Sequence, residues 1–84
     1  RLPLDSVTKR QNASNIADLK NTGGRGGGST TAAHFIADFA GDTPWVHIDV
    51  AATSMLDSTR GWMTAGATGV PTRSLIELAM KLGK

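Results

Sequence analysis

The chain has 84 residues, so it can form at most one small domain, which buries only about 60% of the surface that its unfolded chain exposes. It contains no cysteine, which excludes disulfides, thiolate metal sites and cysteine catalysis. Its net charge of +2 is spread along the sequence and no apolar run approaches the roughly 20 residues of a membrane span, so we expect a soluble segment that binds neither nucleic acid nor membrane.

Helices are predicted on both sides of a glycine-rich stretch. Residues 14–20 suggest a short helix, because apolar residues three apart precede a glycine. Ser29 or Thr30 is expected to cap a second, longer helix, and Gly41 to end it. Apolar residues recur in this second helix at the spacing of a face that packs on a surface: Ala32, Phe35, Ile36, Phe39 and Ala40.

A strand is predicted next, over residues 45–50. Val46, Ile48 and Val50 alternate with Trp45, His47 and Asp49. Both faces carry apolar residues, as expected of an interior strand between layers of helices. Residues 52–67 show no clean period and contain two glycines, so we predict a long loop there.

The last predicted element is a helix with Leu75, Leu78, Ala79 and Leu82 on one stripe. Pro71 suits its first turn and Gly83 its end. The expected order is helix, glycine turn, helix, strand, long loop, helix, which places the chain in the α/β class. Since a lone strand forms no sheet, we expect it to pair with strands outside this chain.

The glycine-rich turn lies in "NTGGRGGGSTTAAHF", residues 21–35. A phosphate-binding P-loop requires a lysine before its Ser or Thr, and a dinucleotide fingerprint requires a preceding strand; neither is present. An RNA-binding segment of the RGG type would need repeats. The favoured interpretation is a tight structural turn, while the amides at the start of the next helix leave anion binding open.

Two pairs of residues are candidates for catalytic groups. His34 and Asp38 are four apart on the polar side of a helix, which favours a weak solvated pair over catalysis. His47 and Asp49 lie near the end of the predicted strand, where open α/β sheets place their sites. No third motif supplies a metal ligand beside them, so a hydrogen-bonded structural role is favoured over catalysis. No G-x-S-x-G elbow supports a serine hydrolase.

Four separated stretches together carry a family resemblance: "RLPL", "ADLKNTGGRGGGSTTAAHFIADF", "WVHIDVAA" and "GATGVPTRSLIEL". In this order they resemble the C-terminal end of the M17 leucyl aminopeptidase (cytosol aminopeptidase) family, over nearly the whole chain. The resemblance implies that residues 1–84 are the C-terminal portion of one catalytic domain, with no separate second domain. It also implies a three-layer α/β/α domain with a mixed sheet.

The resemblance further implies a cytoplasmic homohexamer that removes N-terminal residues, leucine-like ones preferred, from peptides. Two divalent metal ions, Mn²⁺ or Zn²⁺, activate water and polarise the scissile carbonyl in such enzymes. The family's metal ligands and catalytic lysine belong to upstream motifs, notably "NTDAEGR", which is absent here. No catalytic residue and no metal ligand is therefore carried onto this chain, which by itself is expected to be inactive.

Two positions carry over from the family as substrate-binding residues. The residues at Ala51 and Ser54 lie near the pocket for the N-terminal side chain of the substrate in the family. The small Ala51 leaves room for that side chain, whereas Ser54 departs from the apolar residue found in some members. The sequence thus predicts a part of a metalloaminopeptidase that supplies scaffold and pocket wall. Two alternatives stay open: a small stand-alone anion-binding or interaction module, and a catalytically inactive family member.

Overall fold

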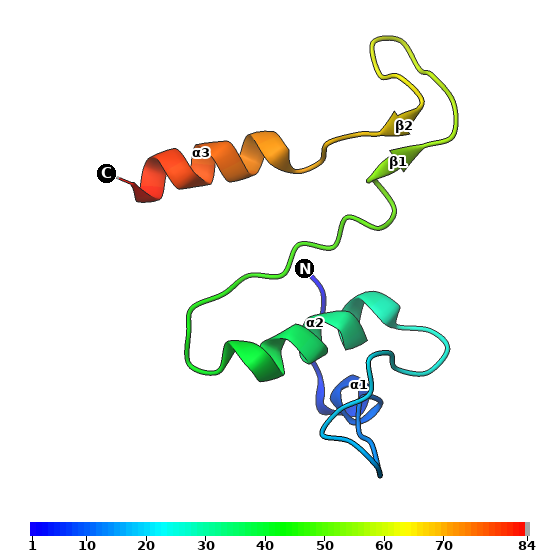
Figure 1. Cartoon of the computed structure of the whole chain (residues 1–84), viewed down its shortest axis with the longest axis vertical. Helices are drawn as coiled ribbons and strands as arrows, with labels where there is room; N and C mark the ends of the chain where they lie inside the picture. The colour runs from blue at the N-terminus through cyan, green and yellow to red at the C-terminus, as the bar shows by residue number, and fades with distance from the viewer. Residues whose placement is uncertain (84) are drawn as a thin grey trace. The chain divides into compact units, whose positions relative to one another are not determined.

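The computed structural model describes residues 1–83. Within them lie the helices and strands α1 (Ser6–Arg10), α2 (Gly28–Ala40), β1 (Met55–Leu56), β2 (Gly66–Ala67) and α3 (Thr72–Leu82), shown in Figure 1. The chain divides into two compact units, the first formed by Arg1–His47 and the second beginning at Ile48. Helices beside a small antiparallel sheet agree with the predicted α/β class. In the part of the chain that the structure describes, no helix has the length and apolar character needed to cross a bilayer.

The first helix begins where Asp5 caps it. Asp5 Oδ1 accepts hydrogen bonds from the backbone N–H groups of Val7 and Thr8, both at 2.8 Å. These are two of the amides that a helix leaves without partners in its first turn, which explains why α1 starts at Ser6.

The helix predicted over residues 14–20 is wrong, because this segment forms bends. Ser14 Oγ accepts hydrogen bonds from the N–H groups of Ile16 and Ala17, at 3.3 and 3.1 Å. A serine side chain that binds nearby backbone in this way offers the chain an alternative to helical hydrogen bonds. The same residue type that suggested a helix start instead stabilises a bend.

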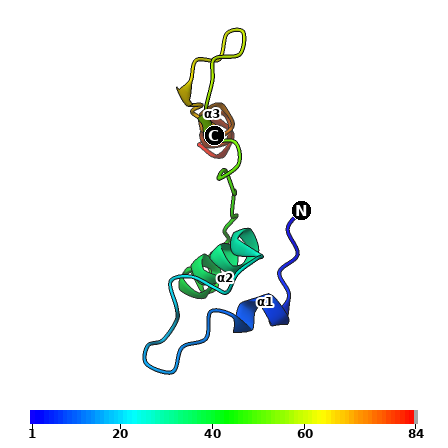
Figure 2. The same cartoon turned by 90° about the vertical axis from the view of Figure 1, so that its right-hand side faces the viewer.

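Helix α1 packs on α2 (Figure 2). A hydrogen bond from Asn12 links the end of α1 to α2. The side chain of Asn12 is 1% exposed, and its Nδ2 donates to the carbonyl oxygen of Thr31 at 2.8 Å. The backbone carbonyl oxygen of Asn12 accepts a hydrogen bond from the N–H of Lys20 at 2.8 Å. This bond holds Lys20 against the end of α1. An ion pair between Lys9 and Asp38, at 2.8 Å, links the two helices at their partly exposed rim.

Helix α2 confirms the predicted second helix, including its end at Gly41, but not its cap or its packed face. Gly27 occupies the N-cap position with a left-handed φ of 69° and makes no side-chain cap hydrogen bond, so the predicted N-cap at Ser29 or Thr30 is wrong. The residues of α2 that are buried are Thr30, Thr31, Ala33 and His34. The predicted apolar stripe remains largely open, since Ile36 is 48% and Phe39 71% exposed.

The second unit contains a hairpin inside the segment that was predicted to be a loop. Strands β1 and β2 pair antiparallel, with Met55 opposite Ala67 and Leu56 opposite Gly66. An isolated bridge between Arg60 and Met63 closes the turn beyond them. The prediction of a loop over residues 52–67 is therefore wrong at Met55–Leu56 and at Gly66–Ala67. Strands of two residues are too short to show a period in the sequence.

The strand predicted over residues 45–50 is not formed, because no residue of this segment belongs to a strand or bridge. A strand requires a paired neighbour, and β1 and β2 pair with each other. The C-terminal helix is confirmed as α3, with Pro71 at its N-cap and Gly83 at its C-cap. All of its described residues are exposed, including the predicted stripe.

Candidate functional site

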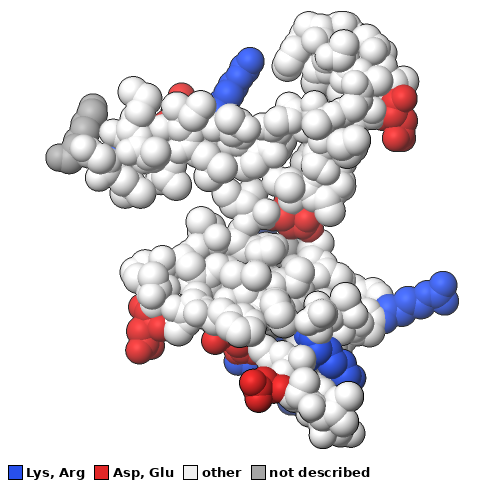
Figure 3. Space-filling model, in the orientation of Figure 1, with Lys and Arg blue, Asp and Glu red and all other residues white. Residues whose placement is uncertain are grey.

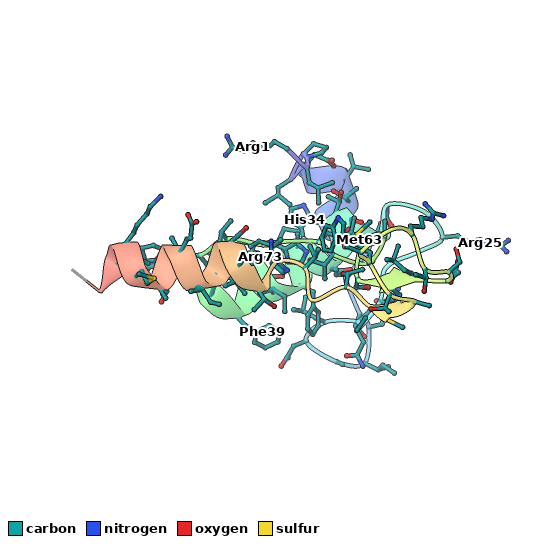
Figure 4. All side chains as sticks on the ribbon, turned by 90° about the horizontal axis from the view of Figure 1, so that it is seen from above. Arg1, Arg25, His34, Phe39, Met63 and Arg73 are labelled. Atoms are coloured by element: carbon teal, nitrogen blue, oxygen red, sulfur yellow. The ribbon has the colours of Figure 1, made fainter. Side chains whose placement is uncertain are left out.

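The backbone of the glycine-rich loop passes very close to α2. A Cβ atom added to Gly23 would lie 2.6 Å from Cγ2 of Thr31, so only glycine fits beside α2 at this point. Gly26 and Gly27 adopt left-handed φ angles of 89° and 69°. Arg25 extends from the loop, away from the ribbon (Figure 4). These observations support the structural interpretation of the turn.

Three amides of the loop and of the first turn of α2 are engaged within the chain. Gly24 N–H donates to Oε1 of Gln11 at 3.3 Å. The N–H groups of Thr30 and Thr31 donate to the carbonyl oxygen of Gly27, at 3.0 and 2.9 Å. These three amides already have acceptors and are therefore not available to an anion.

The predicted solvated pair of His34 and Asp38 is wrong. His34 is only 7% exposed, and its Nε2 is a buried atom without a hydrogen-bond partner. Asp38 binds Lys9 instead. The pKa of Asp5 is lowered below its usual value, chiefly because its carboxylate accepts the N–H of Thr8, and His34 is the smallest of the contributing causes. His34 thus belongs to the packed side of α2.

The two predicted substrate-binding residues flank one tight turn in the second unit. Asp49 Oδ1 accepts the N–H of Ala51 at 2.9 Å, and the N–H of Ser54 donates to the carbonyl oxygen of Val50 at 2.8 Å. Ala51 is exposed and Ser54 is half-buried. Ser54 Oγ donates to the carbonyl oxygen of Ala51 at 3.5 Å, a long bond that directs this hydroxyl back onto the turn. The turn presents Ala51 as a small, open surface.

Hydrogen bonds join this turn to the hairpin. Thr68 N–H donates to the carbonyl oxygen of Ser54 at 2.9 Å, and Thr68 Oγ1 donates to the carbonyl oxygen of Thr53 at 2.7 Å. One threonine therefore fixes the segment after β2 to the segment before β1. This double attachment makes the turn and the hairpin one local structure.

A cavity of about 430 Å³ lies on this local structure, between the turn and the hairpin. Its lining is dominated by the side chains of Met55, Leu56, Trp62, Met63 and Val70. Sequence reasoning missed these residues, because their segment has no periodicity. The signal that was present is Gly61, which has a positive φ in the tight turn between Arg60 and Met63.

His47 and Asp49 each have a local contact of their own in the structure. His47 is half-buried with its ring edge-on to Trp45, the centroids 6.5 Å apart. Asp49 accepts a backbone hydrogen bond within its own turn. Asp49 is thus hydrogen-bonded within its turn although it is exposed, while the contact of His47 is with an aromatic ring.

The described residues do not fit a metal centre. Among residues 1–83, no group of three or more histidine, aspartate or glutamate side chains lies close enough together to hold a metal ion. Charged side chains of both signs lie on the face seen in Figure 3. This part of the chain therefore shows no group of side chains that could hold a metal ion by itself.

The buried apolar core is also small. Ala33 is the buried apolar residue of the described part of the chain. Large apolar side chains remain exposed on α2, the hairpin and α3. Such surfaces are typical of segments that pack within a larger α/β domain.

Comparisons with known proteins also indicate a segment of a larger domain. Residues 1–76 match a protein family described as "Cytosol aminopeptidase family, catalytic domain". A "Probable cytosol aminopeptidase" of Acidobacterium capsulatum is 49% identical over 77 residues, which cover 92% of this chain and 15% of that protein. Proteins with the same printed name from Alkaliphilus metalliredigens and Synechocystis are 48% and 43% identical over 84 residues, covering 100% of this chain and 17% of each. No solved structure matches the chain.

The chain belongs to the cytosol aminopeptidase family. It spans about one sixth of the length of the curated relatives that it matches. The resemblance to the M17 family seen in the four sequence stretches is thereby confirmed.

Proposed function

We propose that this chain is part of the catalytic domain of a metal-dependent aminopeptidase that removes N-terminal residues, leucine-like ones preferred, from peptides. The observation that carries the proposal is the family match over residues 1–76. The relatives' printed names, which are those of cytosol aminopeptidases, supply the reaction class.

The contribution of this chain is scaffold and pocket wall. Ala51 and Ser54 lie at the two ends of one turn that is stabilised by hydrogen bonds from Ala51 N–H and Ser54 N–H. In the proposed pocket, the methyl group of Ala51 leaves space for the N-terminal side chain of the substrate. Ser54 contributes less to an apolar pocket, because its hydroxyl donates to the turn itself.

Two divalent metal ions, Mn²⁺ or Zn²⁺, belong to the proposed enzyme but not to this chain. The lack of a metal-binding group among residues 1–83 is consistent with ligands that lie in other parts of the catalytic domain. No chemical step is assigned to the residues described. Residues 1–84 by themselves are accordingly expected to be inactive.

The partners in this proposal are the remainder of the catalytic domain, further copies of the protein in a homohexamer, and the peptide substrate. The exposed apolar side chains of α2 and α3 support the first of these, since isolated domains seldom expose large contiguous apolar surfaces. The remainder of the domain would complete a three-layer α/β/α fold and provide neighbouring strands for residues 45–50. We place the enzyme in the cytoplasm.

The proposal is tested by measuring the intact mass of the purified protein and its hydrolysis of leucinamide. We expect a mass several times 8.8 kDa and hydrolysis that requires Mn²⁺ or Zn²⁺, is lost with a chelator and returns when metal is restored. N-acetyl-leucinamide, which lacks the free amine, is the matched control substrate and should not be cleaved. A folded, inactive species of 8.8 kDa would overturn the proposal in favour of a stand-alone binding module. A long but inactive protein would indicate an inactive family member.

A further inference from the structure

His34 is a titratable side chain buried in the region where α1 packs on α2, which we call the α1–α2 junction. The side chain is 7% exposed, and its Nε2 is a buried atom without a hydrogen-bond partner among the described residues. The residues described already bury it, so packing against further parts of a larger domain can only bury it more.

Protonation of this ring would be unfavourable where it lies. A protonated imidazole carries an N–H donor on both ring nitrogens, whichever nitrogen holds the proton in the neutral ring. In His34 the charged form would therefore have a buried donor at Nε2 with no acceptor. A buried charge without a partner is far more costly than a buried neutral polar group, so the closed junction favours the neutral ring.

The charged groups around the junction do not supply the missing partner. Asp5, at the start of α1, attracts His34, but it is exposed to solvent and its Oδ1 already accepts two backbone hydrogen bonds. Lys9 of α1 and Asp38 of α2 pair with each other at 2.8 Å, so their effects on His34 oppose each other. The other charged residues of this unit are all exposed: Arg1, Arg10, Asp18, Lys20, Arg25 and Asp42.

We propose that His34 makes the α1–α2 junction sensitive to pH: the neutral ring holds α1 on α2, and protonation releases it. This inference does not depend on the proposed aminopeptidase activity. A histidine in an open segment takes up a proton near about pH 6.5. Because the open state binds this proton and the closed junction does not, acidification below that pH increases the population of the open state.

The release would extend to the glycine-rich loop. Thr31 lies one turn before His34 on α2, and both residues are buried. The carbonyl oxygen of Thr31 accepts the hydrogen bond of Asn12, and its side chain is the surface that Gly23 approaches. Opening at His34 would therefore loosen the contact of Asn12 and that of Gly23 together.

The test is hydrogen exchange, measured by mass spectrometry on the whole protein at about pH 7.5 and about pH 5.5 and corrected for the intrinsic exchange rate at each pH. We expect the protection of peptides from α1 and the first turns of α2 to fall by about 10-fold, the effect of one proton bound only in the open state. His34→Leu, which places an apolar side chain in the buried site, should change by less than about twofold because it has no group to titrate.

Two further variants serve as controls. His47→Leu removes the other histidine of this chain, which is half-buried, and should keep the wild-type fall in protection. Asp5→Asn keeps a side-chain oxygen that can cap α1 but removes the negative charge. Its protection should fall by at least as much as that of the wild type, since the attraction for a protonated His34 is lost. If His34→Leu does not fold, His34→Gln, which is polar and uncharged, replaces it with the same expectation.

Three results would overturn the proposal. The first is a wild-type protein whose junction is equally protected at both pH values. The second is a fall in protection that is the same in the wild type and in His34→Leu. The third is protection that rises on acidification, which would mean that Asp5 holds the protonated ring in the junction.

Discussion

Gly23 lies so close to Thr31 that a methyl group at position 23 would stand 2.6 Å from Cγ2 and 2.9 Å from Cβ of the threonine. The glycine-rich loop therefore brings its backbone against the buried side of α2. Because Thr31 is itself only 4% exposed and receives the hydrogen bond of Asn12, it has little room to move.

We predict that Gly23→Ala lowers the free energy of unfolding by about 1 to 3 kcal/mol, the usual cost of overpacking a closed site. Urea denaturation of the purified protein measures this loss. The matched control is Gly28→Ala, because a Cβ at Gly28 meets no atom within 4 Å and the residue starts a helix. The control should be neutral or stabilising by up to about 1 kcal/mol. If both variants behave alike, the close approach at Gly23 is not a constraint.

Asn12 is predicted to be the main polar link between the end of α1 and α2. Asn12→Ala removes a buried donor from the carbonyl oxygen of Thr31 and should cost about 1 to 3 kcal/mol of stability. Asn15→Ala is the control, since Asn15 is exposed, and should change stability by less than about 0.5 kcal/mol. Amide exchange at Lys20 N–H gives a second readout: its acceptor, the backbone carbonyl oxygen of residue 12, is kept in Asn12→Ala, so a loss of protection there reports that the junction has loosened. Unchanged protection and stability would contradict this role.

The cap at Asp5 predicts a pH dependence. The pKa of Asp5 is lowered from its usual 3.8, first by the hydrogen bond from Thr8 N–H, against a smaller opposing effect of desolvation. A carboxyl group whose pKa is lower in the folded state stabilises that state above its unfolded pKa, and this contribution is lost as the pH falls through the folded pKa.

The measurement compares the thermal midpoints of wild type and Asp5→Ala from neutral pH downward. The variant should melt lower near neutral pH, and the difference should shrink once the pH passes below 3.8. Asp18→Ala is the control at an exposed aspartate. A difference that stays constant down to the lowest pH would show that the Asp5 carboxylate does not act as the cap.

The two long helices were predictable because each has a local signal. Apolar residues recur in both at helical spacing, and the boundaries are set by single residues that end or begin a helix, Gly41 for α2 and Pro71 for α3. The face that α2 buries was not predictable in the same way. Its apolar stripe is exposed while Thr31 and His34 are buried, because α1 contacts the other side.

The missed elements depend on contacts that spacing does not encode. Residues 45–50 alternate as a strand does, yet a strand exists only with a hydrogen-bonded neighbour. The hairpin of β1 and β2 is too short for a pattern and is held by Thr68, whose partners lie 14 and 15 residues earlier. The cavity follows from this pairing, so it could not be predicted before the hairpin was seen. The roles of Ala51 and Ser54 came from the family resemblance and stay predictions.

The assignment of Ala51 to the pocket for the N-terminal side chain yields the last prediction. Ala51→Phe should fill that pocket and lower kcat/KM for leucinamide by at least about 10-fold, because the larger ring and the leucine side chain compete for one space. Glycinamide, which has no side chain there, should lose much less, and the metal content should be unchanged.

Ala52→Phe is the matched control, since Ala52 lines the neighbouring cavity and not the proposed wall. It should leave the ratio of leucinamide to glycinamide turnover near the wild-type value. Steady-state kinetics on the two amides measure this ratio for both variants. Equal losses of leucinamide and glycinamide turnover in Ala51→Phe would mean that this residue supports the fold of the site and does not contact the first side chain.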